Sequence, residues 1–70
     1  MKTITIKDAI SGSTICSGVD YFEITERLQE AFAGAPNDVM QACQECGEAY
    51  ISGAPTYEYE AFLGIEITKD

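Results

Sequence analysis

The alternation of apolar and polar positions near the C-terminal end of the chain predicts a long strand. From Tyr57 to Thr68 the apolar side chains fall on odd positions, so a side-chain period of two places them on one face. The apolar positions are Tyr57, Tyr59, Ala61, Leu63, Ile65 and Ile67. The even positions carry Glu58, Glu60, Phe62 and Glu66. The pattern predicts a strand with one face in the core and an acidic outer face.

The N-terminal segment predicts a β-hairpin. Over residues 2–7, Ile4 and Ile6 alternate with threonine and lysine, which is typical of a half-buried strand. Residues 10–13 have the composition of a turn, and Thr14–Cys16 is a short run of residues that favour strands.

Two amphipathic helices are expected between the hairpin and the last strand. Asp20, with Glu23 three residues later, resembles a capping box and precedes a helical pattern that ends at Gly34. A second helix is expected from about Asp38 to Ile51. The apolar side of the first helix holds Tyr21, Ile24, Leu28, Ala31 and Phe32, and that of the second holds Val39, Cys43, Cys46 and Tyr50.

The element order β-β-α-α-β predicts a two-layer α+β fold, in which two antiparallel helices cover one face of a sheet of about three strands. Antiparallel strands are expected, while the strand order stays open. Seventy residues form a single domain, residues 1–70, near the lower size limit for an independent core, so both a monomer and a homodimer are possible.

Charge narrows the classes of partner. Twelve acidic residues against four basic ones give a net charge of −8. A negative field of this size repels phosphate groups and disfavours direct binding to nucleic acid or an anionic membrane, so basic proteins are the expected partners. The N-terminus has no apolar core of a signal peptide and the chain has no membrane-spanning run, which predicts a cytoplasmic protein.

Cys43 and Cys46 form the one conventional motif, CQEC. Because this pair falls mid-helix in register with Val39 and Tyr50, we expect buried core thiols. A small metal or redox module that also uses Cys16 is the alternative. The chain has no histidine and a single arginine, so we expect no enzymatic activity, no metal and no cofactor.

The acidic side chains are the candidate partner-binding residues. On the predicted strand, Glu58 and Glu60 would stand about 6.6 to 6.8 Å apart, on the scale of closely spaced charges along nucleic acid. Phe62 would be partly covered by a neighbouring side chain or by a dimer contact, which is the favoured interpretation; the functional alternative is an aromatic anchor within an acidic rim. The candidate set is Glu23, Glu26, Glu30, Glu45, Glu48, Glu58, Glu60, Phe62 and Glu66. Mimicry of DNA and a merely solvated acidic surface remain alternatives, and the face that binds stays open.

Small size, acidity, the β-β-α-α-β pattern and the stretches MKTITIKD (residues 1–8) and ITERLQEAF (residues 24–32) resemble small phage-encoded anti-CRISPR proteins. The similarity is greatest to those that act on type I surveillance complexes, type I-C among them. The resemblance spans the whole chain but includes no motif that assigns residues by position. It implies a stoichiometric inhibitor in the bacterial cytoplasm that binds a CRISPR effector subunit and blocks target-DNA binding. A homodimeric acidic adaptor is a further alternative.

Overall fold

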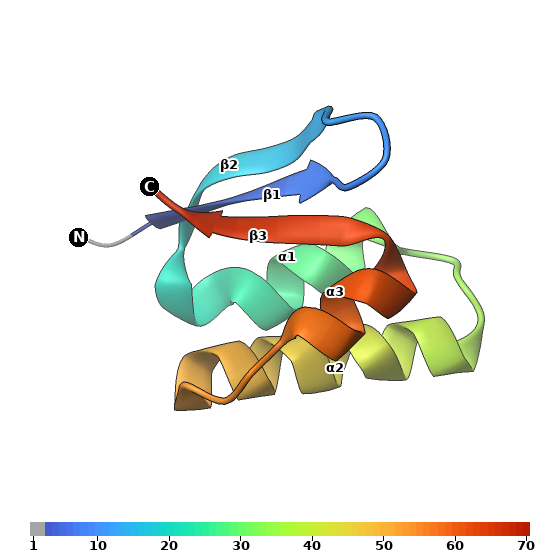
Figure 1. The fold of residues 1–70 in the computed structure, drawn as a ribbon. Coiled ribbons are helices and arrows are strands. Elements are labelled where there is room, and N and C mark those ends of the chain that lie inside the picture. The colour runs from blue at the N-terminus through green and yellow to red at the C-terminus, as the bar shows by residue number, and fades with distance from the viewer. Residues whose placement is uncertain (1–2) are drawn as a thin grey trace.

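The sheet has three antiparallel strands with the N-terminal strand in the centre. The computed structural model describes residues 3–70 and contains β1 (Thr3–Asp8), β2 (Thr14–Asp20) and β3 (Ile65–Lys69). Their order in the sheet is β2-β1-β3, and both pairings are antiparallel (Figure 1). Lys2, which the sequence pattern assigns to the first strand, lies outside the described residues.

Register places apolar residues from each of the three strands on one face. Ile6 of β1 pairs with Cys16 of β2 and with Ile67 of β3. The neighbouring positions pair Thr5 with Thr68 and Lys7 with Glu66, so the opposite face is polar. The prediction of a half-buried first strand is therefore confirmed.

The hairpin between β1 and β2 is also confirmed. Oδ1 of Asp8 accepts hydrogen bonds from the backbone N–H groups of Ile10 (2.8 Å) and Ser11 (3.0 Å), which fixes the turn. Gly12 adopts a positive φ of 76°, a conformation open to glycine at little cost. Strand β2 continues to Asp20, four residues beyond the predicted end at Cys16.

Helices cover the apolar face of the sheet. A 3₁₀ turn, η1 (Tyr21–Glu23), leads into α1 (Ile24–Ala31), which is followed by α2 (Asn37–Ser52) and α3 (Tyr57–Leu63). Figure 1 shows α1 and α2 running in opposite directions beneath the sheet, with α3 between α2 and β3. The predicted α+β class, with helices on one face of a three-stranded sheet, is confirmed. Across residues 3–70, every helix is too short or too polar to cross a lipid bilayer.

The predicted strand over Tyr57–Thr68 is wrong in its first half, which forms helix α3. Gly64 ends the helix with a positive φ of 69°, and β3 begins at Ile65. Tyr59 and Leu63 explain the error, because a spacing of four places two residues on one side of both a strand and a helix. Tyr59 and Leu63 are both partly buried in α3. A strand with the same inward face would bury them as well.

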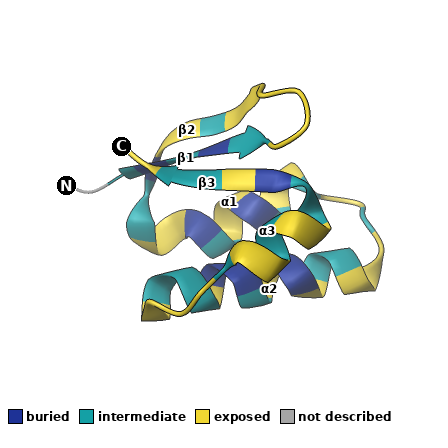
Figure 2. Cartoon of the chain, viewed as in Figure 1, coloured by how far each residue is buried: buried dark blue, intermediate teal, exposed yellow. Residues whose placement is uncertain are grey.

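The core is formed by buried residues of β1, β2, α1, α2 and β3. Figure 2 colours the buried positions of the chain dark blue. The buried members of the core are Ile4, Ile6, Val19, Ile24, Leu28, Cys43, Cys46 and Ile65. The hydroxyl of Tyr21 links η1 to the end of α2, because it donates to the backbone carbonyl oxygens of Tyr50 (2.9 Å) and Ile51 (3.2 Å). The sheet, α1 and α2 therefore form one frame, against which α3 is placed.

Candidate functional site

The candidate partner-binding residues are spread over η1, α1, α2, α3 and β3. The expectation that Glu58, Glu60, Phe62 and Glu66 share a strand face is wrong, because residues 57–63 are helical and Glu66 lies on β3. The remaining candidates lie on two helices, with Glu23, Glu26 and Glu30 at η1 and α1 and Glu45 and Glu48 on α2. Each group therefore has its own surroundings.

A groove between α2 and α3 brings together acids that are distant in sequence. We call it the α2–α3 groove; it measures about 390 Å³. Its lining residues are Asp38, Gln41, Ala42 and Glu45 from α2, and Glu58, Tyr59 and Phe62 from α3. The Phe62 side chain is 59% exposed, although large apolar residues usually lie inside. The groove thus combines carboxylates with accessible aromatic surface.

Glu45 connects the two walls of this groove. Its Oε1 accepts a hydrogen bond from the hydroxyl of Tyr59 on α3 at 3.4 Å, and its Oε2 accepts one from Nε2 of Gln41 at 2.9 Å. Partial burial of the Tyr59 phenol, and next the nearby Glu45 charge, raise the pKa of Tyr59 above its ordinary value. The Tyr59 phenol can donate to Glu45, whose carboxylate therefore contacts both walls of the groove.

Glu60 faces away from the groove, toward β3. Its Oε1 accepts a hydrogen bond from the backbone N–H of Ile67 at 3.0 Å, and its Oε2 accepts one from the hydroxyl of Thr56 at 2.7 Å. Because β3 is an edge strand, the Ile67 N–H has no neighbouring strand to bond. One oxygen of Glu60 thus joins α3 to β3, while the other bonds Thr56 at the start of α3 itself.

The acids of α1 have a cation beside them, whereas those of the groove do not. Arg27 lies 3.7 Å from Glu23 and 3.5 Å from Glu30, in exposed ion pairs. Within the described residues, no lysine or arginine lies within 4 Å of the carboxylates of Asp38, Glu45 or Glu58. Among the described side chains, the groove carboxylates therefore have no cationic partner.

A second hollow, of about 350 Å³, continues the acidic surface from α2 toward α1. It is lined by Gln29, Met40, Gln41, Gln44, Glu45 and Glu48. Glu45 borders both this hollow and the α2–α3 groove. Glu48 lines this hollow but not the α2–α3 groove, while Glu26 and Glu66 are exposed on other elements.

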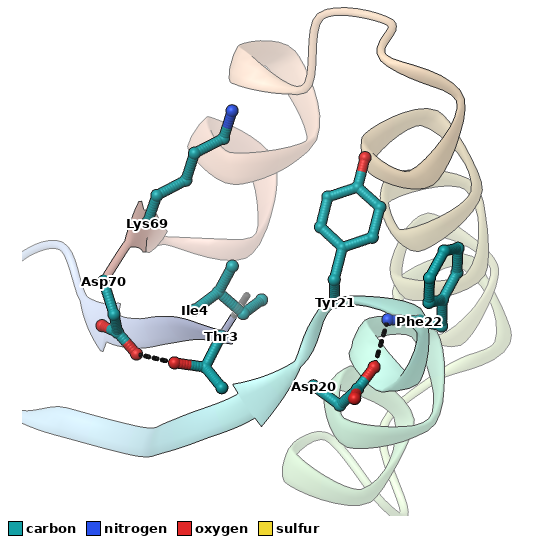
Figure 3. A pocket seen from close by; sticks show the side chains of 7 residues that line it. All are labelled: Thr3, Ile4, Asp20, Tyr21, Phe22, Lys69 and Asp70. Atoms are coloured by element: carbon teal, nitrogen blue, oxygen red, sulfur yellow. Dashed lines mark hydrogen bonds between the residues drawn. The ribbon is translucent and has the colours of Figure 1, made fainter. Parts of the chain in front are cut away.

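A third hollow, of about 580 Å³, lies at the end of the sheet next to η1 (Figure 3). Its two acids already have partners inside the chain. Asp70 accepts hydrogen bonds from the hydroxyls of Thr3 (2.7 Å) and Thr5 (2.6 Å), and Asp20 accepts one from the N–H of Phe22 (2.9 Å). Its Lys69 also introduces positive charge. This hollow is a weaker candidate for a basic partner than the α2–α3 groove.

The two cysteines of the CQEC motif lie in the core, as expected. Cys43 and Cys46 are both fully buried, and burial raises the pKa of Cys46 to about 11, with smaller contributions from Glu60 and Cys43. Cys16 is partly exposed. Over residues 3–70, no three His, Cys, Asp or Glu side chains gather closely enough to hold a metal ion.

In the native protein, a disulfide exchange reagent such as DTNB is expected to modify one thiol quickly and two slowly at pH 8. Cys16 is the accessible thiol, whereas a group with a pKa of about 11 is only about 0.1% thiolate at that pH. The Cys16→Ser variant should lose the fast equivalent. Three equal rates in the folded protein would show that Cys43 and Cys46 are accessible.

Sequence reasoning missed Asp38 as a groove residue and assigned Tyr59 to the core face of a strand. Signals for α3 were present, since Thr56 is a favourable N-cap residue and Gly64 a favourable residue after the helix end. Comparisons with protein-family models, curated proteins and solved structures found no match to this chain. The groove must therefore be interpreted from its own chemistry.

Proposed function

We propose that this protein is a non-enzymatic inhibitor that occupies a basic, nucleic-acid-binding surface of a partner protein with its α2–α3 groove. The observation that carries the proposal is the set of carboxylates of Asp38, Glu45 and Glu58, which form no ion pair within residues 3–70, around the exposed ring of Phe62. The resemblance to anti-CRISPR proteins makes a type I CRISPR effector subunit in the bacterial cytoplasm the first partner to test.

Charge and aromatic surface have different roles in this proposal. The net charge of −8 accelerates encounter with a basic surface and makes association sensitive to salt. Charge alone gives little affinity at an exposed site, because ions and water compete. Burial of Phe62 against the partner would add the apolar contribution that typically dominates interface energies. The inhibitor would then exclude target DNA by occupying the basic surface of the effector that binds DNA.

The thiol-based alternative has less support. Two of its three cysteines are buried in the core, and burial raises the pKa of all three thiols above the ordinary value. Thiolates, rather than thiols, bind metals and attack disulfides. The homodimeric adaptor remains a separate hypothesis, which a mass measurement over a range of concentrations tests.

The charge-reversed variant Asp38→Lys/Glu58→Lys is expected to bind a purified type I surveillance complex about tenfold more weakly than the wild type, or about 1.4 kcal/mol. Both carboxylates line the groove and make no hydrogen bond within the described chain, so their replacement removes attraction and adds repulsion. The measurements are the affinity for the complex and the inhibition of its target-DNA binding, each at low and high salt.

Glu26→Lys/Glu66→Lys is the matched control, since it changes the net charge equally. Glu26 lies in the first turn of α1, as Asp38 does in α2 and Glu58 in α3, whereas Glu66 lies on β3. The tested variant therefore loses one more favourable charge at a helix N-terminus than the control does. If the two variants weaken binding equally, the overall negative charge of the protein would explain the affinity and the α2–α3 groove would not be the binding site. Affinity that does not change with salt, or a wild-type protein that leaves target-DNA binding intact, would contradict the proposal.

A further inference from the structure

We propose that the α2–α3 groove is specific for arginine, so that the partner inserts an arginine side chain whose guanidinium stacks on Phe62 and bonds the surrounding carboxylates. This inference rests on the proposed function and specifies the chemistry of the partner. Its basis is the position of an exposed aromatic ring among acids that form no ion pair with the described lysine and arginine side chains. A groove that attracts cations by charge alone would not need the ring.

The arrangement on α3 fits a planar cation. Glu58 and Phe62 are four residues apart on the helix, so they are neighbours on one side, with Cβ atoms about 5 to 6 Å apart. A guanidinium over the ring can therefore reach the Glu58 carboxylate at the same time. Arginine suits this geometry better than lysine because it is flat, weakly hydrated and able to donate two parallel hydrogen bonds to a carboxylate.

The facing wall is ordered before a partner binds. Nε2 of Gln41 donates to one oxygen of Glu45 at 2.9 Å, and the hydroxyl of Tyr59 makes a longer contact of 3.4 Å with the other, so the carboxylate is restrained on both sides. Each carboxylate oxygen can accept a second hydrogen bond. An arginine that enters the groove therefore meets an acceptor whose side-chain entropy is already reduced, which favours affinity.

The arginine must come from a different protein. Arg27 is the only arginine in the chain, and Glu23 and Glu30 hold it on the exposed side of α1. Two copies of a chain with a net charge of −8 also repel each other. Charge complementarity thus favours a basic partner over a second copy of this protein.

Nona-arginine and nona-lysine peptides test the inference, since they have the same length and the same side-chain charge. In ¹H–¹⁵N NMR titrations of the full chain, nona-arginine should bind about three- to tenfold more tightly. The largest shifts should come from the residues of the groove. Phe62→Leu keeps an apolar side chain but removes the ring, so it should reduce the affinity for nona-arginine to that for nona-lysine and leave nona-lysine unaffected.

Phe22→Leu is the control, because Phe22 is also exposed, at 75%, but lies outside the groove. Equal affinity for the two peptides, or an equal effect of both leucine substitutions, would overturn the arginine inference and leave a charge-based groove intact. Shifts centred on Glu26 or Glu66 would overturn the groove as the site. An arginine preference in a protein that fails to inhibit the surveillance complex would support the inference and contradict the proposed partner.

Discussion

Replacement of Gly47 with alanine is expected to destabilise the protein by about 2 to 3 kcal/mol, although this substitution usually stabilises a helix by about 0.5 to 1 kcal/mol. Gly47 lies in the middle of α2, where α1 crosses it. A Cβ atom at this position would lie 2.7 Å from the Cα of Thr25 and would also clash with the Thr25 hydroxyl. Relief requires α1 and α2 to move apart, because the Cα is part of the backbone.

Thermal unfolding measures this effect. For a domain of this size each kcal/mol corresponds to roughly 4 to 8 °C in Tm, so we expect a decrease of roughly 10 to 20 °C. Gln44→Ala introduces alanine on the exposed side of the same helix and should change stability by less than about 0.5 kcal/mol. Shortening Thr25 to alanine in the Gly47→Ala background should restore only part of the loss. A Gly47→Ala protein as stable as the wild type would show that the two helices can separate easily.

Gly47 also shows what the sequence cannot reveal about this fold. Its backbone conformation is ordinary for a helix, so no turn signal marks it. Its importance comes from the close approach of Thr25, twenty-two positions earlier, and depends on how α1 packs on α2. In contrast, Ile4 and Ile6, or Cys43 and Cys46, were predictable core pairs because their spacing within one element decides which face they share.

The candidate site was predictable in composition but not in arrangement. The sequence indicates that acids and Phe62 are the residues to consider, since charge and aromatic content can be read directly. Asp38 and Glu58 become neighbours of one groove only because α3 packs on α2. The alternation over 57–63 fits a strand equally well. A strand would place Tyr59 on one face and Glu58 and Phe62 on the other, although all three line the groove.

Glu60→Ala is expected to destabilise the protein by about 2 kcal/mol, even though it removes one charge from a strongly acidic chain. The substitution breaks two hydrogen bonds to a carboxylate and leaves the partly buried N–H of Ile67 without its acceptor. Glu58→Ala removes the same charge from the same helix but breaks no hydrogen bond within the described chain, so it should change stability by less than about 0.5 kcal/mol. Glu60→Gln should recover most of the loss, because its amide oxygen can still accept from Ile67.

Amide hydrogen exchange locates the effect, since the Ile67 amide should exchange faster in Glu60→Ala than in Glu58→Ala. The consequence for the groove follows from the position of α3, which Glu60 joins to β3 and Tyr59 joins to Glu45. When the hydrogen bond between Glu60 and Ile67 is lost, a smaller fraction of molecules presents Phe62 opposite α2. The apparent affinity for the peptide falls with that fraction. Glu60→Ala should therefore weaken nona-arginine binding, although Glu60 does not line the groove. If affinity falls while Ile67 exchange stays unchanged, Glu60 contacts the ligand directly and its proposed role in positioning α3 is wrong.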